Sequence, residues 1–321
     1  MELENYLQKY FEINEFRDKQ KETIESLLEE KNTLCLMPTG MGKSLTFQLP
    51  TIINNKLTLI ISPLIALMEQ QNDVLNKLLN SKNISSHAFN SNQDSVVGQF
   101  KYLTDSFRPP NNPRFLFVSP EKMMLDGYAE YTLRHHKDKI GLVVIDEAHC
   151  VSQWGHNFRP AYKMIPKFLD DIFGSNKPPI LCLTATINHR DKEEIIRDFK
   201  IERIVQSDNL MRNNIELHVE GQVKKNEDKK IRLTEILDRF HGEKVIVYTH
   251  IKKRDYGTRE MAKAYKEQGY NCEYFDSDIN FKEKDRILNE FVKGKIKIIF
   301  ATNAFGMGID IPDIRCVVQD R

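Results

Sequence analysis

The sequence has 321 residues, of which 40% are hydrophobic and 29% charged, with 14 Gly and 12 Pro. This composition is that of an ordinary folded protein, and it excludes collagen-like, low-complexity and wholly disordered chains. The 47 Lys and Arg against 46 Asp and Glu leave a net charge of +1, so no global basic field would draw the chain onto a polyanion, and the length predicts two domains.

The five cysteines lie far apart in the sequence, and no two of them form a C-x-x-C pair. We therefore expect no disulfide framework, no zinc site and a reducing compartment. The N-terminus has no basic segment, and the longest apolar runs, such as residues 57–61, are far too short to cross a bilayer. These features predict a protein without a membrane anchor, cytoplasmic in a bacterium or nuclear in a eukaryote.

Short apolar runs rich in β-branched residues alternate with longer amphipathic stretches. The first series occupies residues 33–36, 57–61, 115–118, 142–145 and 180–183. The second series occupies residues 244–248, 271–275, 296–300 and 316–318. Continuous apolar runs separated by helical segments are typical of parallel strands that are covered on both faces. The sequence thus predicts one doubly wound α/β domain over residues 1–211 and a second over residues 212–321.

Residues 221–230 precede the second series and carry charges of both signs that largely cancel. They favour a solvated loop before a helix over residues 231–240. A phosphate-binding patch is the alternative.

The segment 38–44, Pro-Thr-Gly-Met-Gly-Lys-Ser, follows the first apolar run and precedes a helix predicted to start near Lys43. Glycines in such a loop let backbone N–H groups turn toward phosphate oxygens, the lysine reaches the β- and γ-phosphates, and the serine hydroxyl binds magnesium. The strict pattern G-x-x-x-x-G-K-[ST] would place glycine at position 37, where this chain has Met37. We expect ATP and Mg²⁺ to bind here, through Thr39, Gly40, Met41, Gly42, Lys43 and Ser44.

Two acidic residues, Asp146 and Glu147, come directly after the apolar run 142–145. A carboxylate at the carboxyl end of a parallel strand beside a phosphate-binding loop can hold the magnesium shell, and a second one can polarise an attacking water. Ser44 and Asp146 are thus the predicted metal ligands, and Lys43, Asp146 and Glu147 the predicted catalytic residues. The alternative is a pair of acids on a surface loop.

Together with this phosphate-binding loop, Asp-Glu-Ala-His at residues 146–149 resembles a superfamily-two helicase. The next stretch, Cys-Val-Ser-Gln-Trp-Gly-His-Asn-Phe-Arg-Pro at residues 150–160, resembles the aromatic-rich loop of RecQ-type DNA helicases. The resemblance covers about residues 3–318 and implies two RecA-like domains with the nucleotide site between them. It also implies binding to single-stranded and partly duplex DNA, and DNA-stimulated ATP hydrolysis that drives 3'–5' strand separation in repair or recombination.

The aromatic-rich segment is predicted to bind single-stranded DNA. A solvent-facing loop with two aromatic rings and an arginine can stack on bases and contact phosphates. The alternative is that Trp154, the only tryptophan of the chain, anchors the loop to the core. The resemblance implies that binding and its coupling to hydrolysis depend on Gln153, Trp154, Phe158 and Arg159.

Further segments match the same family in order. Those in the first half would each, taken alone, have an ordinary structural interpretation, whereas the run Ala-Phe-Gly-Met-Gly-Ile-Asp at residues 304–310 is too long to match by chance. Residues 16–20 resemble the adenine motif and would otherwise be a helix face. Residues 62–68 and 118–122 resemble turns that contact the DNA backbone and would otherwise be helix starts. Residues 184–186 resemble the motif that links ATP state to DNA grip, and would otherwise be a polar strand end. Residues 245–249 and 301–310 resemble motifs IV and V. These matches assign Arg17, Gln20 and Asp310 to the nucleotide, and Ser62, Pro63, Ser119, Thr184, Thr186, Thr302 and Asn303 to DNA.

Three features depart from the family pattern. Residues 275–279, Phe-Asp-Ser-Asp-Ile, stand where the family has Tyr-His-Ala-Gly-Leu, so DNA contacts from this loop are left open. Glu12 replaces a glycine, which is expected to alter a turn near the adenine site. The motif Q-x-x-G-R-x-G-R, which carries the arginine finger of the family, does not occur in the 321 residues, and the second domain is therefore expected to be partial.

The sequence favours an ATP-dependent DNA helicase. Because an arginine finger strongly accelerates phosphoryl transfer, the alternative is an ATP- and DNA-binding fragment or regulatory module with little turnover. An RNA helicase of a related superfamily is a third possibility, which the aromatic-rich segment disfavours.

Overall fold

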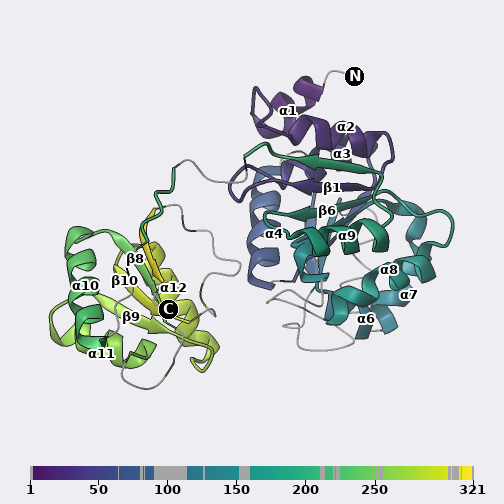
Figure 1. The fold of residues 1–321 in the computed structure, drawn as a ribbon. Helices are drawn as coiled ribbons and strands as arrows, with labels where there is room; N and C mark the ends of the chain where they lie inside the picture. Colours follow the sequence, from purple (N-terminus) through teal and green to yellow (C-terminus); the bar gives the residue numbers. More distant parts are fainter. Residues whose placement is uncertain are drawn as a thin grey trace. The chain divides into compact units, whose positions relative to one another are not determined.

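The computed structural model divides the chain into two compact units, Met1–Ile215 and Glu216–Arg321 (Figure 1). The structure describes residues 3–63, 65–79, 82, 84–89, 114–125, 127–151, 160–209, 214–219, 221, 225–249, 252, 256–302, 305, 311 and 313–319. The predicted domain boundary between residues 211 and 212 lies outside the described residues and stays a prediction.

A parallel sheet forms the centre of the first unit. Its described strands are β1 (Thr33–Leu36), β2 (Leu57–Ile61), β3 (Ser86–Phe89), β4 (Phe115–Val118), β5 (Ile140–Ile145), β6 (Ile180–Thr184) and β7 (Arg203–Gln206). They are ordered β3-β4-β2-β5-β6-β1-β7, and each neighbouring pair is parallel. The order places β5, β6 and β1 side by side, so the segments that follow β5 and β1 leave the carboxyl ends of their strands close together, with only β6 between them.

Helices cover both faces of this sheet. The described helices are α1 (Leu3–Phe11), α2 (Gln20–Leu28), α3 (Leu45–Asn54), α4 (Ile65–Leu79), α6 (Pro120–Leu125), α7 (Gly127–His135), α8 (Pro160–Phe173) and α9 (His189–Asp198), with short 3₁₀ turns η2 (Lys137–Lys139) and η3 (Ala148–Val151). Side chains from α1 to α4 pack in one hydrophobic cluster, and side chains from α6 to α9 pack in another. The first unit is therefore a doubly wound sheet.

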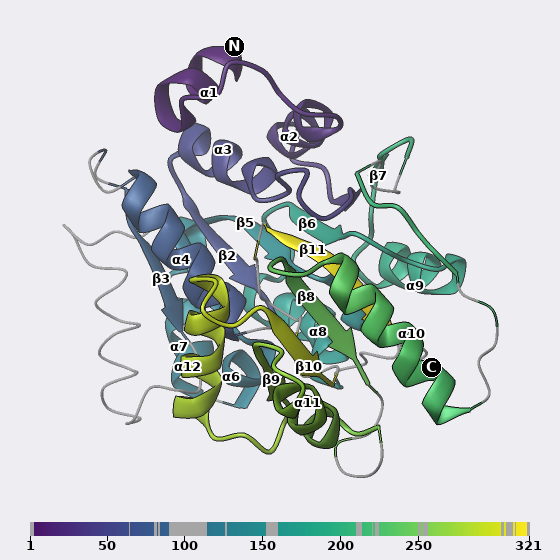
Figure 2. The same ribbon diagram turned by 90° about the vertical axis from the view of Figure 1, so that its left-hand side faces the viewer.

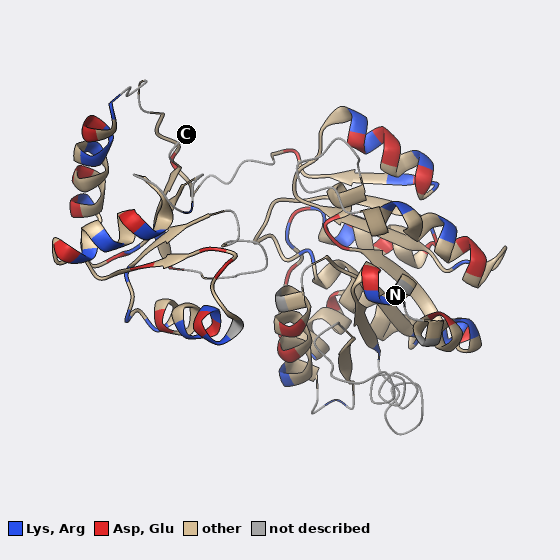
Figure 3. Ribbon diagram, turned by 90° about the horizontal axis from the view of Figure 1, so that it is seen from below, with Lys and Arg blue, Asp and Glu red and all other residues tan. Residues whose placement is uncertain are grey.

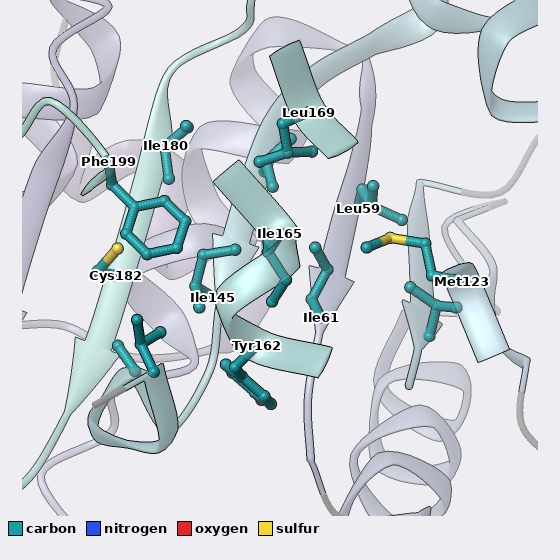
Figure 4. Close-up of a cluster of buried hydrophobic side chains, with 14 of the residues drawn as sticks. Leu59, Ile61, Met123, Ile145, Tyr162, Ile165, Leu169, Ile180, Cys182 and Phe199 are labelled. Carbon is teal, nitrogen blue, oxygen red and sulfur yellow. The ribbon is translucent and has the colours of Figure 1, made fainter. Parts of the chain in front are cut away.

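Successive residues of a central strand serve the two clusters in turn. In β1, Leu34 and Leu36 belong to the cluster under α8 and α9, whereas Cys35 belongs to the cluster under α2 and α3. Since side chains of a strand alternate between faces, a strand covered on both sides must be apolar at every position. Figure 4 shows the cluster under α8 and α9, in which Ile165 of α8 lies near Ile61 of β2 and Ile145 of β5, and to which Tyr162 and Leu169 of α8 also belong.

The second unit has the same construction on a smaller scale. Its described strands are β8 (Lys244–Tyr248), β9 (Cys272–Phe275), β10 (Ile298–Ala301) and β11 (Ile314–Gln319), in the order β11-β8-β10-β9, all parallel. Its helices are α10 (Asn226–Arg239), α11 (Thr258–Glu267) and α12 (Phe281–Val292). Figure 2 shows α12 on one side of this sheet and α10 and α11 on the other, and each side has its own hydrophobic cluster. The predicted α/β class with two parallel sheets is confirmed.

The structure corrects several predicted elements. β3 and β7, the two edge strands, have no counterpart among the predicted apolar runs. The loop predicted for residues 221–230 is wrong in its last five residues, because α10 already begins at Asn226. Glu12 takes a φ of +59°, the left-handed conformation that glycine favours, so the turn after α1 is of the kind that a glycine would form.

All five cysteines are free thiols, four of them buried. In the part of the chain that the structure describes, no helix has the length and apolar character needed to cross a membrane.

Candidate active site

The predicted phosphate-binding loop leaves the carboxyl end of β1 and leads into α3. Gly40 and Gly42 have φ values of +85° and +72°, which residues with a Cβ rarely adopt. At Gly42 a Cβ would also lie 2.6 Å from Nε2 of Gln20. Both φ values favour glycine, and a side chain at position 42 would also force the Gln20 amide to move away from the loop.

Gln20 holds this loop from α2. Its buried side-chain amide donates to the main-chain carbonyl oxygens of Met41 and Gly42, each at 3.0 Å, and its Oε1 accepts from the main-chain N–H of Arg17 at 2.8 Å. In this arrangement both amide hydrogens are engaged on the loop. Reading of an adenine edge by Gln20, and nucleotide contact by the exposed Arg17, stay predictions.

Lys43 and Ser44 form the turn that begins α3. The helix starts at Leu45, two residues later than predicted, with Ser44 as its N-cap residue. The Ser44 hydroxyl makes no capping hydrogen bond. The half-buried Lys43 ammonium donates to the main-chain oxygen of Met37 at 3.4 Å, a long and therefore weak bond. At the helix start, the Lys43 ammonium is thus available to a phosphate, and the Ser44 hydroxyl is available to a cation.

Asp146 follows β5 and is 8% exposed. Its Oδ2 accepts from the Ser62 hydroxyl at 3.1 Å, and its Oδ1 accepts from the main-chain N–H of Glu147 at 3.0 Å. Burial, with the nearby charge of Glu147, raises the pKa of Asp146 to about 6, against the hydrogen bond from Ser62 and the charge of Lys43. A carboxyl group that is destabilised in its ionised form in this way gains from a bound cation, which fits its predicted role as a magnesium ligand.

Glu147 lies beside Asp146 in a left-handed backbone conformation, with a φ of +48°. Its Oε2 is 3.2 Å from Nδ1 of His149. Burial works to raise the pKa of Glu147, but the hydrogen bond from His149 and the charge of Lys43 outweigh it and lower the pKa below its ordinary value. Glu147 is therefore ionised at neutral pH, as a residue that polarises water must be.

His149 connects this pair of acids to β6. Its Nδ1 is also 3.1 Å from the hydroxyl of Thr184, and that hydroxyl donates to the main-chain oxygen of Thr186 at 2.9 Å. Hydrogen bonding to Cys150 and to Glu147 raises the pKa of His149 above its usual range. A chain of contacts thus runs from Glu147 to the carboxyl end of the neighbouring strand, where Thr184 is buried and Thr186 exposed.

The structure places the other predicted DNA residues as follows. The Ser62 hydroxyl is buried against Asp146, and Pro63 is buried next to it. The buried Ser119 hydroxyl accepts from the main-chain N–H of Lys122 at 3.3 Å and caps α6. In the second unit, Thr302 follows β10 and its main-chain N–H donates to the oxygen of Phe275 at 3.1 Å. A DNA contact by any of them stays a prediction.

Six of the predicted site residues lie outside the described residues: Gln153, Trp154, Phe158, Arg159, Asn303 and Asp310.

The loop at residues 275–279, which departs from the family pattern, has its own charge pairing. Asp276 is fully buried and accepts two hydrogen bonds from Arg259, at 2.8 and 3.1 Å. Burial works to raise the pKa of Asp276, and the bonds from Arg259 lower it below the ordinary value. Asp278 accepts from Lys252 at 2.8 Å. The two acids of this loop are therefore neutralised within the second unit.

Tyr162 of α8 is a residue of the site that the sequence interpretation missed. Its hydroxyl donates to the main-chain oxygen of Asp146 at 2.9 Å. The signal available in the sequence was its spacing, because Tyr162, Ile165 and Leu169 form one apolar helix face. That spacing indicates burial but not a polar partner. Among the described residues, no group of three or more His, Cys, Asp or Glu side chains gathers into a metal site.

Comparison with known proteins gives two family matches. The family described as DEAD/DEAH box helicase matches residues 17–195, more than half of the chain, and the helicase conserved C-terminal domain matches residues 228–321.

Curated relatives and solved structures agree with this. The chain is 33% identical over 99% of its length to a probable ATP-dependent DNA helicase, RecS, of Bacillus subtilis, and 32% identical over 96% to the ATP-dependent DNA helicase RecQ of Pasteurella multocida. It spans 60% and 46% of the lengths of these relatives.

The crystal structure of the helicase MrfA bound to DNA superposes on this chain with a TM-score of 0.72 at 18% identity. The superposition covers 99% of this chain and 46% of that one, and it shows that the fold is RecA-like. The chain belongs to the DEAD/DEAH box helicase family, and within it to the RecQ type.

Proposed function

We propose that this chain is the motor of an ATP-dependent DNA helicase, in which DNA-stimulated ATP hydrolysis drives strand separation. The observation that carries the proposal is the meeting of two segments at one edge of the first sheet. The loop with Lys43 follows β1, the pair Asp146 and Glu147 follows β5, and the charge of Lys43 acts on the pKa of both carboxyl groups. A cation for phosphates, beside one carboxylate that can hold a metal ion and a second that can orient water, is an arrangement suited to phosphoryl transfer to water.

Nucleotide binding rests on the loop at residues 38–44. The left-handed glycines direct backbone N–H groups into the loop, and the start of α3 adds its helix dipole. Lys43 holds the β- and γ-phosphates, and Gln20 keeps the loop in shape through its two carbonyl contacts. Because the loop is held before nucleotide arrives, little ordering cost is left for binding.

Hydrolysis rests on Asp146 and Glu147. Mg²⁺, when bound with ATP, supplies charge neutralisation at the β- and γ-phosphates. Ser44 and Asp146 would hold it, since the one has an uncapped hydroxyl and the other a buried carboxyl group that favours a cation. Glu147, ionised at neutral pH, orients and polarises the attacking water.

DNA is the proposed second substrate. The relatives RecS and RecQ are named DNA helicases, and MrfA is described as bound to DNA, which supports this assignment. Single-stranded and partly duplex DNA, translocation from 3' to 5', and a role in repair or recombination are proposed by similarity to this family. The same similarity supports a location in the bacterial cytoplasm or the eukaryotic nucleus, which we propose with it.

The decisive experiment is ATP hydrolysis by Lys43→Ala with and without single-stranded DNA. Loss of the phosphate-binding charge is expected to lower the stimulated rate at least about 100-fold. Lys56→Ala is the matched control, because Lys56 directly precedes β2, at the opposite edge of the same sheet, and should leave the rate unchanged. If Lys43→Ala hydrolyses ATP at the rate of the unaltered protein, the proposal is wrong.

Two further measurements separate the alternatives. A chain that binds ATP and DNA but shows no stimulated turnover, even before mutation, would be a binding module and not a motor. Stimulation by single-stranded RNA that equals stimulation by DNA of the same length would favour an RNA helicase.

A further inference from the structure

Tyr162 is held entirely within the core of the first unit. The side chain is 0% exposed and lies on the face of α8 that packs against β2 and β5, beside Ile165 (Figure 4). A buried phenol needs a partner for its hydroxyl, because leaving that group unpaired in an apolar surrounding is costly. The partner is the main-chain oxygen of Asp146, at 2.9 Å. The helix thus reaches the backbone of the two catalytic carboxylates through one side chain.

This hydrogen bond completes the fixing of one peptide group, the one that joins Asp146 to Glu147. Its carbonyl accepts from Tyr162, and its N–H donates to Oδ1 of Asp146 at 3.0 Å. The neighbouring main-chain groups are also held. The main-chain N–H of Asp146 donates to the main-chain oxygen of Ile61 at 2.9 Å, and the main-chain oxygen of Glu147 accepts from the main-chain N–H of Cys150 at 2.9 Å. Both polar ends of the peptide are therefore pinned.

The peptide needs this support because Glu147 has a φ of +48°. A residue with a Cβ is strained there, and such a conformation persists only when its surroundings determine it. The orientation of the peptide before Glu147 sets φ, and φ sets the direction in which the Glu147 side chain leaves the backbone. A small misplacement of a group that orients a reacting water costs a large factor in rate.

We propose that Tyr162 is a positioning residue for Glu147: its hydroxyl fixes the peptide between Asp146 and Glu147, and so aims the carboxylate that activates water. The inference rests on the proposed ATP hydrolysis. It assigns to α8 a part in the chemical step, distinct from its packing role.

The test is Tyr162→Phe, which removes the hydroxyl and keeps the ring. The turnover number for ATP is expected to fall about 10- to 100-fold, both with and without DNA, while KM for ATP and the affinity for a fluorescent ATP analogue change less than about twofold. Tyr265→Phe is the matched control. Tyr265 is a buried tyrosine of α11 that likewise donates to a main-chain oxygen, that of Lys230 at 3.2 Å, and its change should leave the turnover number intact.

A double-variant measurement separates positioning from loss of folded protein. If the hydroxyl acts by aiming Glu147, Tyr162→Phe has almost no further effect once Glu147→Gln has removed the carboxylate. If the two changes lower the rate by independent factors, the hydroxyl has only a structural role and the inference fails. It fails equally if Tyr162→Phe turns over at the normal rate. In either case the proposed function stands as long as Lys43→Ala is inactive.

Discussion

Ser62 and Asp146 form a buried pair in which a hydroxyl supports a carboxylate, 3.1 Å from oxygen to oxygen. The Ser62 hydrogen bond lowers the pKa of Asp146 by stabilising its ionised form, in opposition to burial. Ser62→Ala should therefore raise this pKa above about 6, so that protons compete better with the metal. Hydrogen bonds to charged groups are worth about 1.5–3 kcal/mol, or about one to two pKa units, so we expect the Mg²⁺ concentration for half-maximal ATP hydrolysis to rise about 2- to 15-fold at pH 7. A magnesium titration of the ATPase rate measures this.

Ser119 supplies the control. The sequence predicted a DNA contact for it, as for Ser62, but its hydroxyl caps α6, and it is not among the groups that change the pKa of Asp146. Ser119→Ala should leave the magnesium requirement unchanged. An effect of Ser62→Ala on affinity for single-stranded DNA, without any change in the magnesium requirement, would instead support the DNA contact that the sequence suggests.

Single residues were predictable where the chemistry fixes the residue type. A lysine after paired glycines predicts a phosphate site, and two acids after an apolar strand predict a metal ligand and a water-polarising group. The structure brings Lys43, Asp146 and Glu147 to the carboxyl ends of nearby strands. Their supporting partners were not predictable. Ser62 lies 84 residues from Asp146 and Tyr162 lies 16 residues away, and both contacts depend on which strands and helices become neighbours.

At the scale of elements, Asn32 joins three segments at the start of β1. Its Nδ2 donates to the main-chain oxygens of Phe199 and Lys200, each at 3.2 Å, and its Oδ1 accepts from the N–H of Ile180 at 3.0 Å. Asn32→Ala would leave the first residue of β6 without its partner. We expect the free energy of unfolding of the first unit to fall by about 2 kcal/mol, measured by urea denaturation with circular dichroism.

Asn271 is the natural comparison, because it stands just before β9 and its Nδ2 donates to a single main-chain oxygen, that of Lys295. Asn271→Ala should cost less, about 1 kcal/mol or below, because this bond is exposed. Equal midpoints for Asn32→Ala and the unaltered protein would show that the side chain does not tie the strands together.

Elements were predictable in proportion to their burial. Every strand of the first sheet with neighbours on both sides appeared in the sequence as an apolar run. The edge strands did not: β7 exposes three of its four residues, and β3 begins Ser-His. A strand at the end of a sheet is only partly covered, so its sequence need not be apolar throughout. The early start of α10 was missed for a related reason, since its first turn is charged and exposed.

At the scale of the molecule, the described residues form four hydrophobic clusters, and each of these draws its described residues from one unit. The two series of apolar runs in the sequence predicted this division into two sheets. Charge is distributed differently from apolar residues. Figure 3 shows Lys and Arg interspersed with Asp and Glu along the helices of both units, and the whole chain carries a net charge of +1.

This balance leads to a prediction for DNA binding. A protein that neutralises DNA phosphates releases the counterions bound to them, so its binding weakens as salt is added. For single strands, the slope of the logarithm of the binding constant against the logarithm of the salt concentration is about −0.7 for each phosphate contacted. With no net basic field, binding depends on a few placed groups, and we expect a slope between about −2 and −4, or about three to six contacts. Fluorescence anisotropy of a labelled single-stranded oligonucleotide, titrated from about 50 to 300 mM NaCl, gives this slope. A slope of about −7 or steeper would require ten or so contacts and a basic surface that the charges of this chain do not provide.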